Sequence, residues 1–138
     1  MKRIIFILLL PVLLVSCVSY VDEVNMQTVN LSIKASDWVS HADNNGRNSY
    51  YSTSFTMPEI TRDVFENGSV QVYIYIDDQV QQVLPYTRHF EDVYGTRWTR
   101  TVDYDFSEGE LVVYVTYSDF RQYNPGVMSL KVAVLSQN

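Results

Sequence analysis

The feature that most constrains the fold is a regular alternation of apolar side chains with polar or tyrosine side chains. In residues 69–77 the apolar positions are Val70, Val72, Ile74 and Ile76. Successive side chains of a β-strand point to opposite faces of a sheet, so a period of two predicts a strand with one buried face. The same period recurs through most of the chain after residue 27. The sequence therefore predicts a mainly β architecture.

This alternation predicts seven strands, at residues 28–35, 50–57, 69–77, 80–86, 98–106, 111–118 and 127–135. Residues 87–94 have a mixed pattern and are given no firm assignment. Pro85 lacks a backbone N–H, which suits a sheet edge or a bulge rather than a central strand. Residues 107–110 read as a hairpin turn, with Gly109 at a position that favours positive φ.

One segment departs from the period of two and predicts a short helix at residues 60–67. Thr61 is placed to cap its N-terminus, and Ile60 with Phe65 forms a hydrophobic staple. Asn67 and Gly68 supply a left-handed stop. Seven short strands with one helical crossover predict an all-β fold, a two-sheet antiparallel immunoglobulin-like sandwich, with a closed barrel as the alternative.

The N-terminus has the pattern of a secretory signal. Lys2 and Arg3 precede an apolar run at residues 4–15, which is shorter than the roughly 20 residues that span a bilayer. The sequence Leu-Val-Ser-Cys that ends at Cys17 resembles the lipobox of bacterial lipoproteins, which implies that this cysteine is lipidated and becomes the mature N-terminus. The alternative is an ordinary signal or an uncleaved anchor. We predict a lipoprotein signal peptide at 1–16, a lipidated tether at 17–27 and the sandwich at 28–138.

Charge and cysteine content exclude several functions. Removal of the signal leaves eight basic residues against sixteen acidic ones, a formal charge of −8. Such a surface repels phosphate backbones, so we expect no nucleic-acid partner. Cys17 is the only cysteine, so the mature chain has no disulfide, and lipidation removes thiol catalysis and thiolate metal binding. We expect no cofactor.

Several short motifs resemble those of small exported lipoproteins from gut bacteria. They are Ser36-Asp37-Trp38, Leu84-Pro85-Tyr86, Trp98-Thr99, Tyr104-Asp105-Phe106 and the run 109–120, which ends in Thr-Tyr-Ser-Asp-Phe. The resemblance covers most of the mature chain. It implies an immunoglobulin-like sandwich and no particular activity.

The residues that could carry catalysis do not form a recognised motif. His41 and His89 are the only histidines, and neither lies in a metal or nucleophile pattern. Asp103 and Asp105 share one strand face and so suggest the paired carboxylates of a glycosidase, but their neighbours Thr99 and Thr101 are polar, which indicates a solvated face. The Asp-Asn-Asn-Gly sequence at 43–46 loosely matches a calcium loop without its closing Glu, so an Asx turn is favoured. We predict no catalytic residue and no metal site.

Tyrosines that point away from aliphatic strand faces are the main candidates for binding. Tyr73 and Tyr75 face away from the buried side of residues 69–77, and Tyr114 does the same in residues 111–118. If these two strands are neighbours, Gln71, Tyr73, Tyr75 and Tyr114 form one outward surface. Amphipathic rings of this kind suit a sugar or a protein interface. The alternative is that tyrosine was selected for strand propensity and cross-strand pairing.

We therefore predict a non-enzymatic binding or assembly module, anchored in the membrane through Cys17, with a glycan or an envelope protein as ligand. The alternatives are a structural envelope subunit without its own ligand and, less favoured, a membrane-proximal hydrolase. Val18 follows the lipidated position where inner-membrane retention often uses Asp, and Asp22-Glu23 weakly resembles a surface-export tag. We predict an outer-membrane location and leave open which side of that membrane the protein faces.

Overall fold

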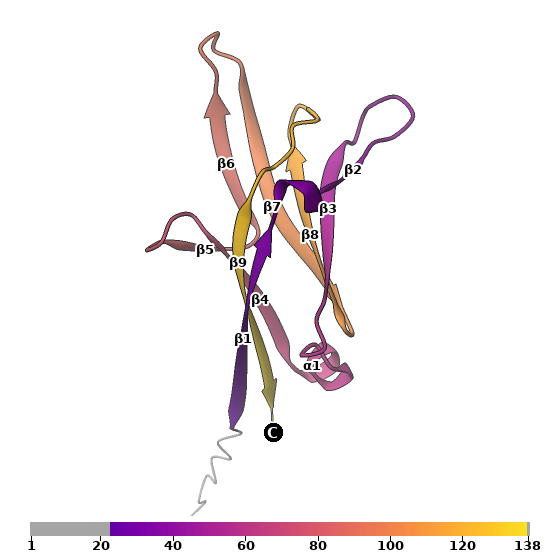
Figure 1. Ribbon diagram of the computed structural model, residues 1–138, viewed down its shortest axis with the longest axis vertical. Coiled ribbons are helices and arrows are strands. Elements are labelled where there is room, and N and C mark those ends of the chain that lie inside the picture. The colour runs from indigo at the N-terminus through magenta and orange to yellow at the C-terminus, as the bar shows by residue number, and fades with distance from the viewer. Residues whose placement is uncertain (1–22, 138) are drawn as a thin grey trace, which may run out of the picture.

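A computed structural model describes residues 23–137 as a two-sheet structure (Figure 1). The predicted signal peptide at 1–16 and the lipidated Cys17 lie outside the described residues. Nine strands, one short α-helix and one 3₁₀ turn follow in the order β1 (Val24–Ile33), η1 (Ala35–Asp37), β2 (Val39–His41), β3 (Tyr50–Thr56), α1 (Arg62–Asn67), β4 (Ser69–Tyr75), β5 (Gln81–Val83), β6 (Tyr86–Glu91), β7 (Arg97–Ser107), β8 (Glu110–Tyr117) and β9 (Met128–Gln137).

The strands form two antiparallel sheets. The four-stranded sheet has the order β1-β9-β4-β5, and the five-stranded sheet has the order β2-β3-β8-β7-β6. Consecutive segments repeatedly cross between the sheets, through η1, α1, the β5–β6 connection and the loop from β8 to β9. This arrangement confirms the predicted fold class of an antiparallel sandwich with one short helix.

The core lies between the sheets and is made by the faces that the alternation predicted to be buried. Val72, Val113 and Val132 are completely buried, and each comes from a central strand. Tyr104 of β7 crosses the core and donates its hydroxyl to the backbone carbonyl of Val70 in β4, at 2.8 Å. Burial raises the pKa of the Tyr104 hydroxyl, which stays protonated and able to donate. The hydrogen bond therefore joins the two sheets.

The first strand begins at Val24, four residues earlier than predicted, so the end of the predicted tether at 17–27 is part of the sheet. All ten residues of β1 pair with β9, from Val24 opposite Gln137 to Ile33 opposite Met128. Val24 and Met26 are more than half exposed. Because this end of the strand has no buried face, periodicity could not reveal it, and only the pairing with β9 defines it.

Three edge strands, β2, β5 and β6, differ from the sequence prediction. The strand β2 was not predicted, since it has only three residues and no buried face. The predicted strand at 80–86 ends after Val83, and the chain crosses at the cis peptide Leu84–Pro85 to start β6 in the other sheet. The edge position expected for this proline-containing segment is confirmed, because β5 is the outermost strand of its sheet.

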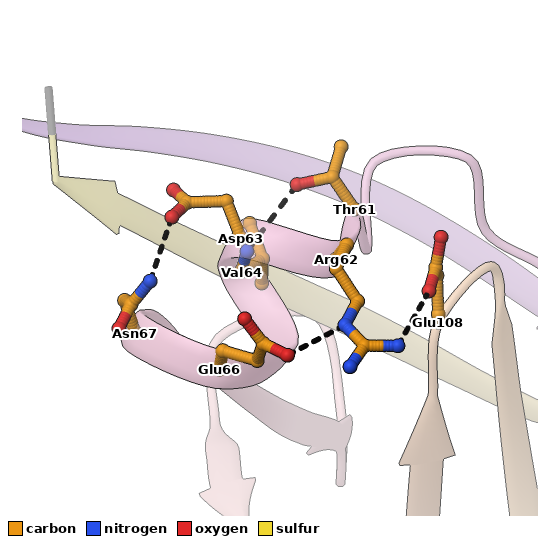
Figure 2. Close-up of polar contacts among 7 residues, drawn as sticks. All are labelled: Thr61, Arg62, Asp63, Val64, Glu66, Asn67 and Glu108. Atoms are coloured by element: carbon orange, nitrogen blue, oxygen red, sulfur yellow. Dashed lines mark hydrogen bonds and ion pairs between the residues drawn. The ribbon is translucent and has the colours of Figure 1, made fainter.

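The helix α1 fills one end of the space between the sheets, here called the closed end, where β1 begins and β7 turns into β8 (Figures 1 and 2). The predicted cap is confirmed: Thr61 Oγ1 accepts a hydrogen bond from the Val64 backbone N–H at 3.3 Å. The segment before α1 is tied to the β7–β8 turn, because the Gly109 N–H donates to the Ile60 carbonyl at 2.8 Å. Arg62 reaches Glu66 at 2.6 Å and Glu108 at 3.9 Å.

The helix ends differently from the prediction. Gly68 has φ −97°, so the expected left-handed stop is wrong. Its lack of a side chain has another reason: a Cβ there would lie 2.3 Å from the Leu135 carbonyl oxygen and 2.9 Å from Val64 Cα. Glycine is needed because the helix end packs directly against the backbone of β9. Phe65, expected in the staple, is half exposed and packs edge-on against Phe106 at 6.2 Å.

Candidate functional site

The structure divides the predicted tyrosine surface between the two sheets. Tyr73 and Tyr75 lie in β4 of the four-stranded sheet, whereas Tyr114 lies in β8 of the five-stranded sheet. The prediction that all of them share one face with Gln71 is therefore wrong. It assumed that β4 and β8 are neighbours, but β4 pairs with β9 and β5, and β8 pairs with β3 and β7.

Tyr73 and Tyr75, which stay together on β4, contact neighbouring side chains of the same sheet. The Tyr73 hydroxyl donates to Gln71 Oε1 at 3.0 Å, and the Lys131 ammonium lies 4.5 Å from the centre of the Tyr73 ring. The Tyr75 hydroxyl reaches Asn30 Oδ1 at 3.5 Å, across the intervening strand β9. The contacts of Tyr73 with Lys131 and of Tyr75 with Asn30 join different strands, as in the alternative of cross-strand pairing that the sequence left open.

Tyr114 belongs to an acidic surface on the other sheet. With Tyr50, Asp103 and Asp105 it lines a shallow depression of about 270 Å³. Burial raises the pKa of the Asp103 carboxyl, and the neighbouring charge of Asp105 raises it further. Burial, followed by the charge of Asp105, also raises the pKa of Tyr114. The predicted placement of the two aspartates on one face therefore leads to mutual repulsion between their carboxylates.

The histidines and the loop at 43–46 do not form a reactive site. His41 lies in β2 and His89 in β6, the two opposite edges of the five-stranded sheet, so the structure does not bring them together. His41 Nε2 lies 2.8 Å from Ser52 Oγ, and its ring stacks on Tyr50. Asp43 Oδ1 accepts hydrogen bonds from the backbone N–H groups of Asn45 and Arg47, which confirms the favoured Asx turn.

A cavity lies at the end of the sandwich opposite α1, here called the open end. It has a volume of about 570 Å³ and separates the start of β9 and the end of β4 from β6 and β7. Ile76, predicted to be buried, is 39% exposed because the sheets part at this point, and it lines the cleft. The cleft is also lined by Tyr75, Asp77, Asp78, Tyr86, Arg88 and Arg100.

Two arginines face each other across neighbouring strands on one wall of this cleft. Arg88 of β6 is directly opposite Arg100 of β7 in the ladder. Like charges at directly opposed positions destabilise a sheet. Among residues 23–137, neither guanidinium lies within ion-pair distance of a carboxylate, and the buried Nε of Arg100 has no hydrogen-bond partner. The wall is therefore a concentrated positive site in an acidic protein.

Aromatic rings hold the two guanidinium groups in place. Arg88 and Arg100 lie 5.8 and 5.6 Å from the centre of the Phe90 ring, and this ring stacks on Trp98 with centroids 5.7 Å apart. A ring face attracts a cation, which partly offsets the repulsion between the arginines. Arg121 covers the Trp98 ring at 3.7 Å, but it is paired with Asp119 and is thus neutralised.

Arg100 also affects Tyr117 in the adjacent strand β8. Burial raises the pKa of the Tyr117 hydroxyl, and the nearby positive charge of Arg100 partly opposes that rise. Tyr117 thus remains a neutral neighbour and does not compensate the charge of Arg100. The arrangement of paired, unneutralised arginines in a cleft is suited to binding an anionic group.

Sequence reasoning missed this site because its residues carry no motif. Arg88 and Arg100 are twelve positions apart, and Arg88 falls in the segment 87–94, which was left without a firm assignment, whereas Arg100 falls in the predicted strand at 98–106. A usable signal was present: four of the eight basic residues that follow the predicted signal, at 88, 97, 100 and 121, lie within 34 positions.

Comparisons with known proteins gave no relative from which a function could be transferred. No protein-family model matches the chain, and no curated protein or solved structure matches it significantly. Within residues 23–137, no helix has the length and apolar character needed to span a membrane. The same residues contain no group of three metal-ligating side chains placed to hold an ion.

Proposed function

We propose that the protein is a non-enzymatic binding module of the cell envelope, anchored through Cys17, that holds its ligand in the open-end cleft. The observation that carries the proposal is the Arg88–Arg100 pair, which lines a cleft of about 570 Å³ and forms no ion pair with a carboxylate among residues 23–137. Small-molecule sites typically have about 300–1,000 Å³ and a few convergent polar groups. The two opposed arginines repel each other across the ladder, and a bound anion would relieve that repulsion.

The position of the cleft supports an anchored receptor. Val24 begins β1 at the closed end (Figure 1). The residues that line the cleft lie at the other end of the sandwich. A chain held at its N-terminus would therefore present the cleft away from the membrane. A glycan or a protein segment could then reach it without passing between the domain and the lipid surface.

A glycan array with the full mature chain tests this function. We expect binding to a set of anionic glycans that is lost in the double variant Arg88→Gln/Arg100→Gln. Arg62→Gln is the matched control, because Arg62 lies at the closed end beside α1. Equal binding by the wild type and the double variant would remove the cleft from consideration, and would leave the tyrosines of β4 as the surface to test.

A second candidate function, a structural subunit, is favoured by the edge strand β1. Within residues 23–137 this strand pairs only with β9 and contains neither a charged residue nor a proline over its ten residues. The other edges are protected: β2 and β5 have three residues each, and β6 carries charges. An unprotected edge is a template for a strand of a partner.

Light scattering of the purified chain alone and with solubilised envelope proteins tests the subunit function. Thr28→Lys places a charge on the exposed side of the β1 edge and should abolish any complex. A complex that survives this substitution would mean that the edge is not used.

A further inference from the structure

The two walls of the open-end cleft carry opposite charges. Arg88 and Arg100 come from the five-stranded sheet, and Asp77 and Asp78 come from the β4–β5 connection. Asp77 Oδ1 accepts hydrogen bonds from the backbone N–H groups of Gln79 and Val80, each at 2.8 Å. The Asp77 carboxylate therefore shapes the turn that lines this side of the cleft. The formal charges of the four side chains cancel, and positive and negative groups are separated across the cavity.

We infer that the ligand is a carboxylated sugar, a uronic acid residue of an acidic glycan. This inference rests on the proposed function and gives the cleft a chemical class of ligand. The sugar carboxylate lies against the guanidinium groups of Arg88 and Arg100, and its hydroxyl groups donate to the carboxylates of Asp77 and Asp78. The arginines then have an anionic partner, and the aspartates have hydrogen-bond donors.

The charge balance selects a monoanion. A planar carboxylate accepts parallel hydrogen bonds from a guanidinium, and it brings one negative charge to a pair of cations. A phosphate monoester brings close to two negative charges at neutral pH. With Asp77 and Asp78 on the facing wall, that second charge is repelled rather than neutralised.

The rest of the lining suits a sugar ring. Tyr86, Ile76 and Met128 contribute apolar surface to the lining. A pyranose has C–H groups on its faces and hydroxyl groups around its rim. Its C–H faces pack against apolar side chains, and its hydroxyl groups donate hydrogen bonds to acceptors. The buried Arg100 Nε has no hydrogen-bond partner among residues 23–137.

Isothermal titration of the mature chain with trigalacturonate and with the corresponding glucuronate oligosaccharide tests the inference. The methyl ester of trigalacturonate is the matched ligand control, since it keeps the sugar and removes the charge. We expect at least one of the two acids to bind, and Arg88→Gln or Arg100→Gln to weaken that binding by about 10- to 100-fold, as loss of a hydrogen bond to a charged group implies. We expect Arg62→Gln to bind as the wild type does and the ester to bind at least tenfold more weakly than the acid.

The outcomes separate the inference from the proposed function. If a neutral sugar, inorganic phosphate or an amino acid binds in a manner that depends on Arg88 and binds more tightly than both uronates, the cleft is a binding site but the inference is wrong. If the acid and its ester bind equally, the carboxylate is not recognised and the inference is wrong. If no probe or arrayed glycan binds in an Arg88-dependent manner, both the inference and the proposed function fail.

Discussion

At the closed end of the sandwich the space between the sheets is filled, and at the open end the sheets part. The closed end has a capped helix, a turn bonded to the segment before that helix, and an arginine side chain paired with glutamates. The open end has a cleft of about 570 Å³, a partly exposed Ile76 and two opposed arginines. Both ends belong to the same two sheets, so the architecture does not impose the difference.

The difference between the two ends separates features that stabilise the fold from features that do not. Local propensity, packing and charge agree at the closed end, as expected where the only requirement is stability. At the open end the charges conflict with the sheet pairing that holds them. Conflicts of this kind concentrate at functional sites, where a ligand supplies the missing partner. The comparison therefore supports the proposed site at the open end by an argument separate from the cavity volume.

The largest effect is expected at the closed end, from Gly68→Ala. The added Cβ would meet the Leu135 carbonyl and Val64 Cα, both backbone atoms that cannot rotate away. We expect a loss of about 3 kcal/mol in the free energy of unfolding, at the upper end of the range for overpacking, measured by urea denaturation. Gly95→Ala at the open end is the matched control.

Gly95 has φ +80°, and a Cβ added there would meet no other atom within 4 Å, so its substitution adds only backbone strain. We expect a cost of about 1–2 kcal/mol for Gly95→Ala. An equal or smaller loss for Gly68→Ala would show that the helix end is loosely packed, and the contrast between the two ends would be lost.

Neutralising one arginine at each end is expected to change the free energy of unfolding by less, and in opposite directions at the two ends. Arg88→Gln removes half of a like-charge pair and should raise the free energy of unfolding by about 0.5 kcal/mol. Arg62→Gln removes the exposed ion pair with Glu66 and should lower it by a few tenths of a kcal/mol. Thermal and urea unfolding at low ionic strength measure both changes. Destabilisation by Arg88→Gln would mean that Arg88 supports the fold.

The smallest effect is a local response to acid. Hydrogen bonds from the backbone N–H groups of Thr96 and Tyr94 lower the pKa of the Asp92 carboxyl in the β6–β7 turn. The stability that Asp92 contributes is therefore fully present above its unfolded pKa of 3.8 and is lost as the pH falls through the lowered folded value. The Thr61 cap at the closed end does not titrate.

Amide chemical shifts and exchange rates of Tyr94 and Thr96, followed by NMR as the pH is lowered from about 5 to 2, measure this response. The Val64 amide at the Thr61 cap should change little over the same range. Asp92→Asn keeps an acceptor without its charge and should abolish the pH dependence. A transition at Tyr94 and Thr96 that persists in this variant would assign the acid response to another group.

The strands that have one buried face were predictable from the sequence, and the short or exposed ones were not. In β8 the buried residues are the alternate positions Leu111, Val113, Val115 and Tyr117, as expected. In contrast, β2 has three residues, and the first part of β1 is exposed on both faces. Periodicity reports burial, so a strand that buries nothing leaves no pattern.

The candidate site was less predictable than the fold. Tyr73 and Tyr75 were correctly placed on an outward face, because that depends on alternation within one strand. Their predicted association with Tyr114 failed, because it depends on which strands are neighbours. The Arg88–Arg100 pair needs both the register of the β6–β7 ladder and the parting of the sheets, and neither is a local property.

By itself the sequence determined that the chain forms antiparallel strands, which side of each central strand is buried, and where the helix is capped. These features follow from side-chain period and from hydrogen bonds between residues close in the chain. Only the tertiary structure decided that β4 and β8 lie in different sheets, that Gly68 packs on the β9 backbone, and that two arginines meet in a cleft. Those outcomes depend on crossovers between the sheets and on contacts between distant segments, which no local pattern encodes.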